Sequence, residues 1–207
     1  MIKAEEKEKE KYKLFHYAEE QQKTQIILCH TSRPISNYMA GLKNRMDGQY
    51  KRIPNYVISR RGKVIKNFQD LHHSDFFGDE TIDNHSIIVM LENLGWLKLN
   101  PLNNEYTNWI GDIYRGKVYQ KKWRDKNFWA TYTDKQIESL ADLVTHLCEE
   151  LGIEKVLVGH NVKVDGIKKF NGVCSRSNYT DYWTDLSPAF EFDKLKEHLN
   201  QDEKEQT

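Results

Sequence analysis

Three short runs of apolar residues constrain the fold of this chain most. One is Ile26–Cys29, and the other two lie within Ser86–Leu91 and Lys155–Gly159. A strand that is buried on both faces reads as a continuous apolar run, whereas a strand with one exposed face alternates between apolar and polar residues. Because helical patterns separate these runs, the sequence predicts a mixed α/β fold in which helices flank a central mixed β-sheet.

The strongest helical pattern lies in the second half of the chain. Thr133-Asp134-Lys135-Gln136 has the form of a capping box, apolar residues follow at helical spacing as far as Leu151, and Gly152 ends the run. This pattern predicts a helix that buries one face. The other expected elements are a hairpin over 55–59 and 63–67, a helix after Pro34 and a closing helix over 192–199.

The length of 207 residues suits one domain with appendages. Lys, Glu and Gln dominate residues 1–23, which are expected to form a charged helical extension. The folded domain is expected over 24–200, with an insertion at about 97–130, where the sequence turns polar and aromatic. Residues 201–207 are expected to form a disordered polar tail.

Charge and cysteine content exclude several kinds of partner and site. Lys plus Arg and Asp plus Glu number 31 each, so no net field would attract nucleic acid or anionic lipid. Met1–Glu10 is rich in Lys and Glu, so no secretory signal is expected, and no apolar stretch predicts membrane insertion. Cys29, Cys148 and Cys174 are odd in number and widely spaced, which argues against disulfides and against a thiolate zinc site. We expect a monomer.

Two histidines share one sequence context. His30 and His160 each follow a short apolar strand directly, and strand ends in open sheets are where ligand crevices form. A single histidine at such a place is more often a structural polar residue at the rim of the core than a functional one. A second histidine in the same context favours the functional interpretation only modestly. A carboxylate, Asp185, lies in the Pro-containing segment Thr184–Phe190, where by itself it would be read as a turn residue or a helix cap.

The order of four motifs resembles the type-2 N-acetylmuramoyl-L-alanine amidases. These motifs are His30–Ser32, Ser86–Asn93, Gly159–His160 and Thr184–Phe190, and the resemblance runs from about residue 25 to 199. This family includes phage lysozyme-type amidases, bacterial recycling amidases and animal peptidoglycan recognition proteins.

The resemblance implies a single zinc ion as cofactor, with His30, His160 and Asp185 as its ligands. Three protein ligands leave the fourth position of tetrahedral zinc open for water, which the metal activates near neutral pH. The implied reaction is hydrolysis of the amide between the lactyl group of muramic acid and L-alanine in peptidoglycan.

The implied partner is peptidoglycan or a soluble muropeptide, and the implied role is that of an endolysin of a phage or prophage. Such a protein is synthesised in the cytoplasm without a signal peptide and acts on the cell wall after release by host lysis. Two alternatives remain open. One is a catalytically weak or inactive peptidoglycan-binding module of the same fold, and the other is an amidase that acts on another amide as a toxin or a recycling enzyme.

The helper groups of the family are only partly matched. A Glu used by recycling amidases falls on Met90, and a Lys and a Tyr used by phage-type members fall on Trp183 and Pro54. Glu92 would lie on the same strand face as Met90, so it is the candidate proton carrier. Arg176 is the candidate for stabilising the oxyanion, and the alternative is that it ties its loop to a carboxylate.

The same mapping implies a set of groove residues. The candidates for binding substrate are His73, Asn84, Tyr56 and Asn55. His73 could equally be a structural histidine. The tryptophans of the insertion could stack on sugar faces, although core packing is the usual role of this residue type. They are Trp109, Trp123 and Trp129.

Overall fold

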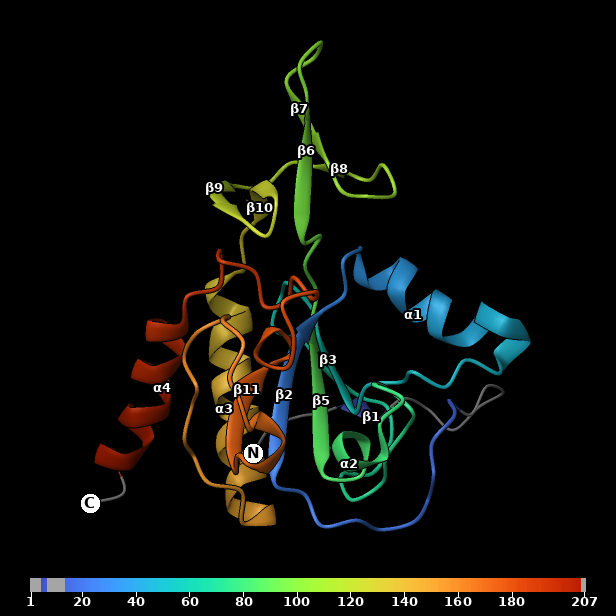
Figure 1. The fold of residues 1–207 in the computed structure, drawn as a ribbon, viewed down its shortest axis with the longest axis vertical. Helices are drawn as coiled ribbons and strands as arrows, with labels where there is room; N and C mark the ends of the chain where they lie inside the picture. The colour runs from blue at the N-terminus through green and yellow to red at the C-terminus, as the bar shows by residue number, and fades with distance from the viewer. Residues whose placement is uncertain (1–4, 7–13, 206–207) are drawn as a thin grey trace.

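The computed structural model describes residues 5–6 and 14–205 and contains two β-sheets (Figure 1). The first sheet has six strands in the order β1-β4-β3-β5-β2-β11. All of its strand pairs are parallel except β3 with β4, so the predicted mixed sheet with flanking helices is confirmed. The strands of this sheet are β1 (Glu5–Glu6), β2 (Gln25–His30), β3 (Tyr56–Ile58), β4 (Val64–Lys66), β5 (Ser86–Leu91) and β11 (Gly172–Ser175).

Helices cover both faces of this sheet, as Figure 1 shows. Side chains alternate along β2, so Ile26 and Leu28 pack in the core with α3 and α4, whereas Ile27 and Cys29 pack in the core beside α1 and α2. The helices are α1 (Ile35–Asn44), α2 (Glu80–Asp83), α3 (Asp134–Leu151) and α4 (Phe192–Glu205). Short 3₁₀ helices occupy Arg45–Gly48, Ile167–Lys169 and Arg176–Asn178.

The predicted boundaries of α3 are confirmed. The Thr133 hydroxyl accepts a hydrogen bond from the Gln136 backbone N–H at 3.2 Å, and the Gln136 side chain accepts one from the Thr133 N–H at the same distance. This is the reciprocal arrangement of a capping box. Gly152 ends the helix with a φ of 68°, a left-handed conformation that costs glycine little.

The strand predicted at Lys155–Gly159 is wrong as a full strand. This segment touches the sheet through one parallel bridge, Leu157 with Val173, and β11 takes the edge position beside β2. Val156 is 49% exposed, so the run is not buried on both faces as its composition suggested. The chain then turns at Gly159, whose φ is 75°. The apolar run is therefore an edge segment that carries His160 outwards.

The predicted insertion forms the second sheet. Its five antiparallel strands follow the order β8-β7-β6-β10-β9 and project from the body of the molecule at the top of Figure 1. Trp129 is fully buried and its indole N–H donates to the Lys121 carbonyl at 2.8 Å, so core packing is its role. The strands are β6 (Trp96–Asn100), β7 (Glu105–Thr107), β8 (Ile113–Tyr114), β9 (Val118–Trp123) and β10 (Lys126–Ala130).

Both predicted appendages need correction where they are described. Residues 14–24 are not helical. Leu14 is buried with Leu42, Ile53 and Phe68, and the backbone N–H groups of Tyr17 and Gln21 donate to the carbonyls of His73 and Leu71 at 2.8 and 2.9 Å instead of forming helical bonds. Residues 201–205 continue α4, since Gln, Glu and Lys favour helix, so they are not the disordered tail that was expected. Residues 1–4, 7–13 and 206–207 of the predicted extension and tail lie outside the described residues.

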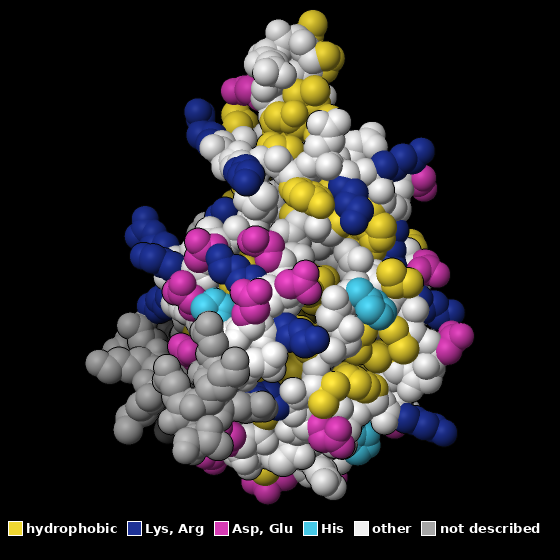
Figure 2. Space-filling view, turned by 90° about the vertical axis from the view of Figure 1, so that its left-hand side faces the viewer, with side chains coloured by type: hydrophobic (Ala, Val, Ile, Leu, Met, Phe, Trp, Pro, Cys, Tyr) yellow, Lys and Arg dark blue, Asp and Glu magenta, His cyan; other side chains and the backbone are white. Residues whose placement is uncertain are grey.

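Charges of both signs intermix on the face of the molecule that Figure 2 shows, the side on which α4 lies. This agrees with a chain that has 31 basic and 31 acidic residues. Within 5–6 and 14–205, no helix has both the length and the apolar character that a membrane crossing requires.

A buried lysine gives a prediction on stability. Lys23 is 2% exposed and its ammonium donates to the Asn84 carbonyl at 2.7 Å. Burial lowers the pKa of Lys23 to about 8, although Asp83 and Asp70 oppose the shift. Above pH 8 the unfolded chain therefore binds more protons at this residue than the folded chain does. The free energy of unfolding should thus rise with pH until the unfolded pKa, near 10.5, by about 3 kcal/mol in total.

The measurement is urea denaturation of the wild type and of Lys23→Met between pH 7.5 and 10.5. The difference in unfolding free energy between the two proteins should shift in favour of the wild type as pH rises. A difference that stays constant over this range would show that folding does not lower the pKa of Lys23.

Candidate functional site

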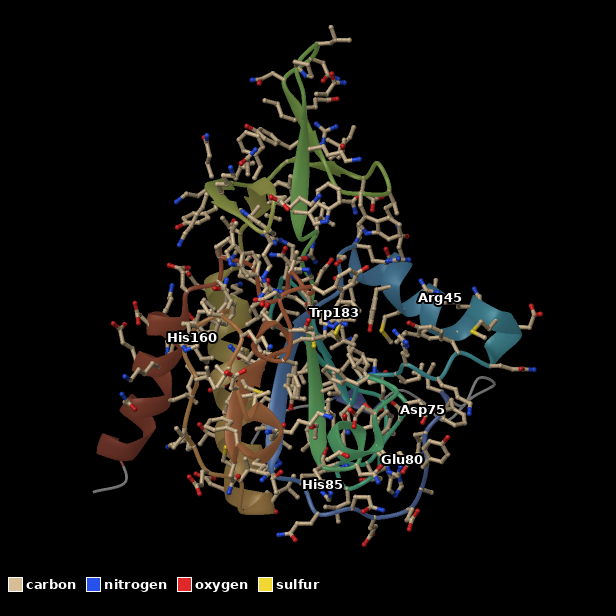
Figure 3. The ribbon with its side chains drawn as sticks, in the orientation of Figure 1. Arg45, Asp75, Glu80, His85, His160 and Trp183 are labelled. Atoms are coloured by element: carbon tan, nitrogen blue, oxygen red, sulfur yellow. The ribbon has the colours of Figure 1, made fainter. Side chains whose placement is uncertain are left out.

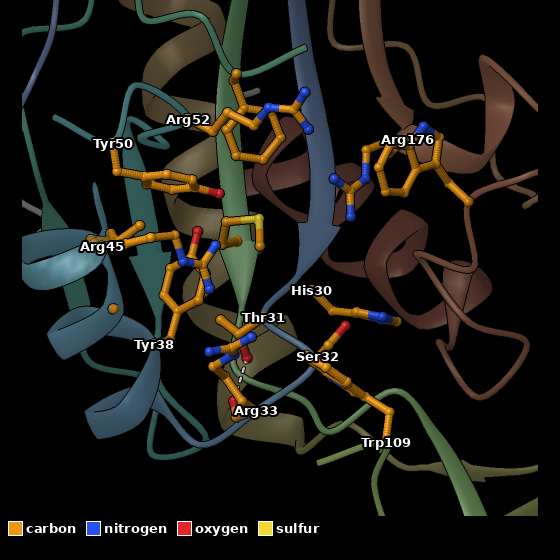
Figure 4. Close-up of a pocket in the computed structure, with 15 residues that line it drawn as sticks. His30, Thr31, Ser32, Arg33, Tyr38, Arg45, Tyr50, Arg52, Trp109 and Arg176 are labelled. Atoms are coloured by element: carbon orange, nitrogen blue, oxygen red, sulfur yellow. Dashed lines mark hydrogen bonds between the residues drawn. The ribbon is translucent and has the colours of Figure 1, made fainter.

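The main candidate site is a cleft at the carboxyl end of β2. It has a volume of about 280 Å³ and is shown in Figure 4. Its lining includes His30 and Met90, at or next to the carboxyl ends of two adjacent parallel strands, which is the edge of the sheet where crevices form. Its other lining residues are Thr31, Ser32, Arg33, Tyr38, Gly41, Leu42, Arg45, Tyr50, Arg52, Phe76, Trp109, Arg176 and Trp183.

His30 lines this cleft and is 2% exposed. Its Nδ1 lies 3.1 Å from the Tyr132 hydroxyl, and its Nε2 faces Gly95. A Cβ on Gly95 would lie 3.0 Å from Nε2, so this position requires a glycine, which also has a φ of 73°. Burial lowers the pKa of His30 to about 4, with Arg176 acting in the same direction and Asp185 opposing it. The imidazole is therefore neutral at pH 7 and keeps a lone pair for a ligand or a proton.

Asp185 lies next to His30 but is bound to an arginine. The carboxylate is 1% exposed and the Arg176 side chain 15% exposed. Arg176 Nε lies 3.0 and 2.9 Å from the two carboxylate oxygens, and its Nη2 lies 2.8 Å from Oδ2. The backbone N–H of His30 donates to the same Oδ2 at 3.2 Å. Both oxygens thus already have strong, charge-assisted partners.

His160 does not join this pair. Its side chain is exposed, and its Nδ1 accepts a hydrogen bond from the Val162 N–H at 3.3 Å. It lines a separate hollow of about 570 Å³ beside the start of α4, which shares no residue with the cleft at His30. Figure 3 shows His160 on the α4 side of the molecule and Trp183 over the centre of the sheet.

As they lie, these residues do not fit a zinc ion. Two of the three predicted ligands, His30 and Asp185, are neighbours, but Asp185 is neutralised by the Arg176 guanidinium and His160 faces elsewhere. Among the described residues, no three His, Cys, Asp or Glu side chains form a group that could hold a metal ion. The role of all three residues as zinc ligands stays a prediction.

Glu92 has a structural role in this fold. One of its carboxylate oxygens accepts the N–H of Ile35, at the start of α1, at 2.9 Å, and the other accepts the N–H of Arg60 at 2.8 Å. Glu92 is also absent from the lining of the cleft. A carboxylate near a helix N-terminus is stabilised there by the unpaired N–H groups of the first turn. Its role in proton transfer stays a prediction.

The predicted groove residues lie outside the cleft. His73 forms a bridge with Tyr17 and stacks on its ring at 4.9 Å, contacts that agree with the structural role that was the alternative. Asn84 lies just before β5, at the opposite end of that strand from the cleft. Asn55 and Tyr56 are each 2% exposed. Both side chains have a polar partner there, since the Asn55 side chain accepts the Ile88 N–H and the Tyr56 hydroxyl donates to Asp70.

The structure also brings in residues that the sequence did not single out. Arg33, Arg45 and Arg52 line the cleft, as do Tyr38 and Tyr50. They come from α1 and the segments on either side of it, and their irregular spacing in the chain gives no motif. Met90 and Trp183, onto which the sequence resemblance maps two helper groups of the family, line the cleft as well. The exposed Trp109 lies at its rim and remains a candidate for stacking on a sugar.

Comparison with solved structures shows which proteins share this fold. The AmiD amidase from E. coli superposes with a TM-score of 0.54 at 14% identity, over 87% of this chain and 59% of its own. The LysC amidase from Clostridium intestinale gives 0.55 at 10% identity, over 97% and 99%. AmpDh3 from Pseudomonas aeruginosa gives 0.55 at 12%, over 87% and 61%. This chain therefore spans about three fifths of the length of two of these proteins.

Comparison at the level of sequence gives the family. No curated protein matches this chain. The family model described as N-acetylmuramoyl-L-alanine amidase matches residues 9–172, which is most of the 207 residues, although the match stops before Arg176 and Asp185. The resemblance that the motifs suggested is thereby confirmed, and the chain belongs to the type-2 N-acetylmuramoyl-L-alanine amidase family.

Proposed function

We propose that this protein hydrolyses the amide between the lactyl group of muramic acid and L-alanine in peptidoglycan. Family membership carries the proposal. The cleft that the neutral His30 lines supports it, because this cleft lies at the carboxyl ends of the parallel strands, where ligand crevices form. Two structural relatives were solved with muropeptides, AmiD with anhydro-N-acetylmuramic acid-L-Ala-D-γ-Glu-L-Lys and AmpDh3 with an anhydromuramic pentapeptide.

The finer part of the proposal is zinc dependence, with His30, His160 and Asp185 as ligands. It requires two rearrangements, since Asp185 has to leave Arg176 and His160 has to turn out of its own hollow. Release from Asp185 would also free the Arg176 guanidinium to act on the substrate, the oxyanion role proposed for it. We further propose a monomeric endolysin of a phage or prophage that reaches the cell wall on host lysis.

A second candidate function is favoured by a specific observation. The permanently charged Arg176 guanidinium already neutralises the Asp185 carboxylate. Met90 and Trp183, which the resemblance maps onto proton carriers of the family, line the cleft and cannot carry a proton. A protein that keeps this arrangement would bind muropeptides in the cleft without cutting them.

The test is digestion of purified peptidoglycan with the protein in the presence of zinc, followed by mass spectrometry of the released material. We expect free stem peptides that begin with L-alanine, no such peptides when a chelator is added, and a loss of at least a hundredfold in Asp185→Asn. Parallel digests of intact sacculi and of soluble muropeptides separate a lytic role from a recycling role.

Cosedimentation of the protein with sacculi separates the two candidate functions. Cosedimentation without peptide release, under conditions in which an established amidase releases peptides, would replace the amidase proposal with the binding module. Absence of both would remove peptidoglycan as the ligand.

A further inference from the structure

The cleft at His30 has an unusual charge distribution. Four arginines line it, namely Arg33, Arg45, Arg52 and Arg176, and no Asp or Glu is among its lining residues. Asp185 neutralises only Arg176, from behind the cleft wall. Within the described residues, Arg33, Arg45 and Arg52 form no ion pair with a carboxylate. We call these three residues the arginine set.

Two members of the set lie close together on one wall. A Cβ on Gly41 of α1 would be 3.9 Å from Arg33 Nη1 and equally 3.9 Å from Arg45 Nη2, so both guanidiniums approach the same spot on the helix. Like charges that are held this close repel each other, and a bound anion between them would remove that repulsion. The small Gly41 leaves room for such an anion at the helix surface.

Aromatic rings hold these guanidiniums by their faces. The Arg33 Cζ lies 5.4 Å from the ring centre of Trp109, and the Arg45 Cζ lies 4.6 Å from that of Tyr50. A guanidinium that stacks on a ring keeps its N–H edge free, and that edge matches a carboxylate with two parallel hydrogen bonds. The walls of the cleft thus orient the arginines for an anionic ligand.

The proposed substrate contains anions of this kind. A γ-linked D-glutamate, as in the muropeptide bound to AmiD, keeps its α-carboxylate free, and the stem peptide ends in another carboxylate. We infer that the arginine set binds the free α-carboxylate of the stem peptide's D-glutamate, so that this protein prefers acidic stems to stems whose D-glutamate is amidated. This inference rests on the proposed function and names the feature of the substrate that the cleft selects.

The test is equilibrium binding of two synthetic muramoyl tripeptides that differ only in D-glutamate or D-isoglutamine, measured by calorimetry at low and at physiological salt. We expect the acidic peptide to bind at least tenfold more tightly than the amidated one. The double variant Arg33→Gln/Arg45→Gln should lose most of this preference and should weaken binding of the amidated peptide by less than threefold. The matched control is Arg61→Gln, an exposed arginine in the turn of the β3–β4 hairpin, which should leave both affinities unchanged.

Each outcome bears on one of the two proposals. Equal affinity for both peptides, or a preference that persists in the double variant, would overturn the inference while leaving the proposed amidase in place. A preference that holds while the protein supplied with zinc releases no stem peptide would support the inference and count against the amidase. If neither peptide binds, both proposals fail.

Discussion

Replacing Asp185 with alanine should lower the free energy of unfolding by about 3–5 kcal/mol, because it leaves the mostly buried Arg176 guanidinium without its counter-ion. This loss of unfolding free energy exceeds the net contribution of the ion pair, because it includes the cost of an unpaired buried charge. Three contacts of 2.8–3.0 Å with Asp185 compensate the desolvation of the Arg176 guanidinium. Within the described residues, no other acidic side chain forms an ion pair with Arg176. The measurement is chemical denaturation of the metal-free protein with a chelator present.

The control for this prediction is the double variant Asp185→Ala/Arg176→Met. It removes both charges and replaces Arg176 with an apolar side chain of similar length. Its free energy of unfolding should therefore exceed that of Asp185→Ala by about 1 kcal/mol or more. Equal or lower stability of the double variant would mean that the two side chains do not form a buried pair.

Replacing Arg176 with glutamine should raise the affinity for zinc by roughly ten- to a hundredfold. A metal ion can bind Asp185 only after the guanidinium has left, so the ion pair competes with the metal for the same two oxygens. Breaking the ion pair costs about 1.5–3 kcal/mol, the range of a hydrogen bond to a charged group. Removal of this cost corresponds to the expected increase in zinc affinity. Zinc should also restore much of the stability that the variant loses, because the ion then neutralises the buried carboxylate.

Calorimetric titration with zinc measures this effect, and Arg52→Gln is its matched control. Arg52 also lines the cleft but forms no ion pair with Asp185, so its removal tests the general effect of one fewer positive charge. If both variants gain the same factor, or if Arg176→Gln binds zinc no better than the wild type, Arg176 does not compete with the metal.

The central part of the fold could be predicted because its strands and its main helix have clear sequence patterns. The runs in β2 and β5 are apolar on both faces, and α3 carries a capping box, an apolar stripe and a terminal glycine. The second sheet could not be predicted in the same way. Its strands are mostly half-buried or exposed, as in β9, so they show neither a continuous apolar run nor a clean alternation.

The candidate site was predictable only in part. His30 and Asp185 were correctly expected to be neighbours, and the alternative for Arg176, that it holds a carboxylate, is what the structure contains. The position of the His160 side chain depends on how an edge segment turns, and the sequence of that segment does not fix this. The contacts of Glu92 could not be predicted, because its partners are backbone N–H groups, which any residue type other than proline at those positions would supply.

The most direct test of the Arg176–Asp185 ion pair is a crystal structure of the protein grown in the presence of a chelator. We expect Arg176 Nε and Nη2 within about 3 Å of the Asp185 carboxylate, with His160 turned away from His30. Convergence of His30, His160 and Asp185 on one point, with Arg176 directed into solvent, would contradict this arrangement and show a metal site that is formed before zinc binds.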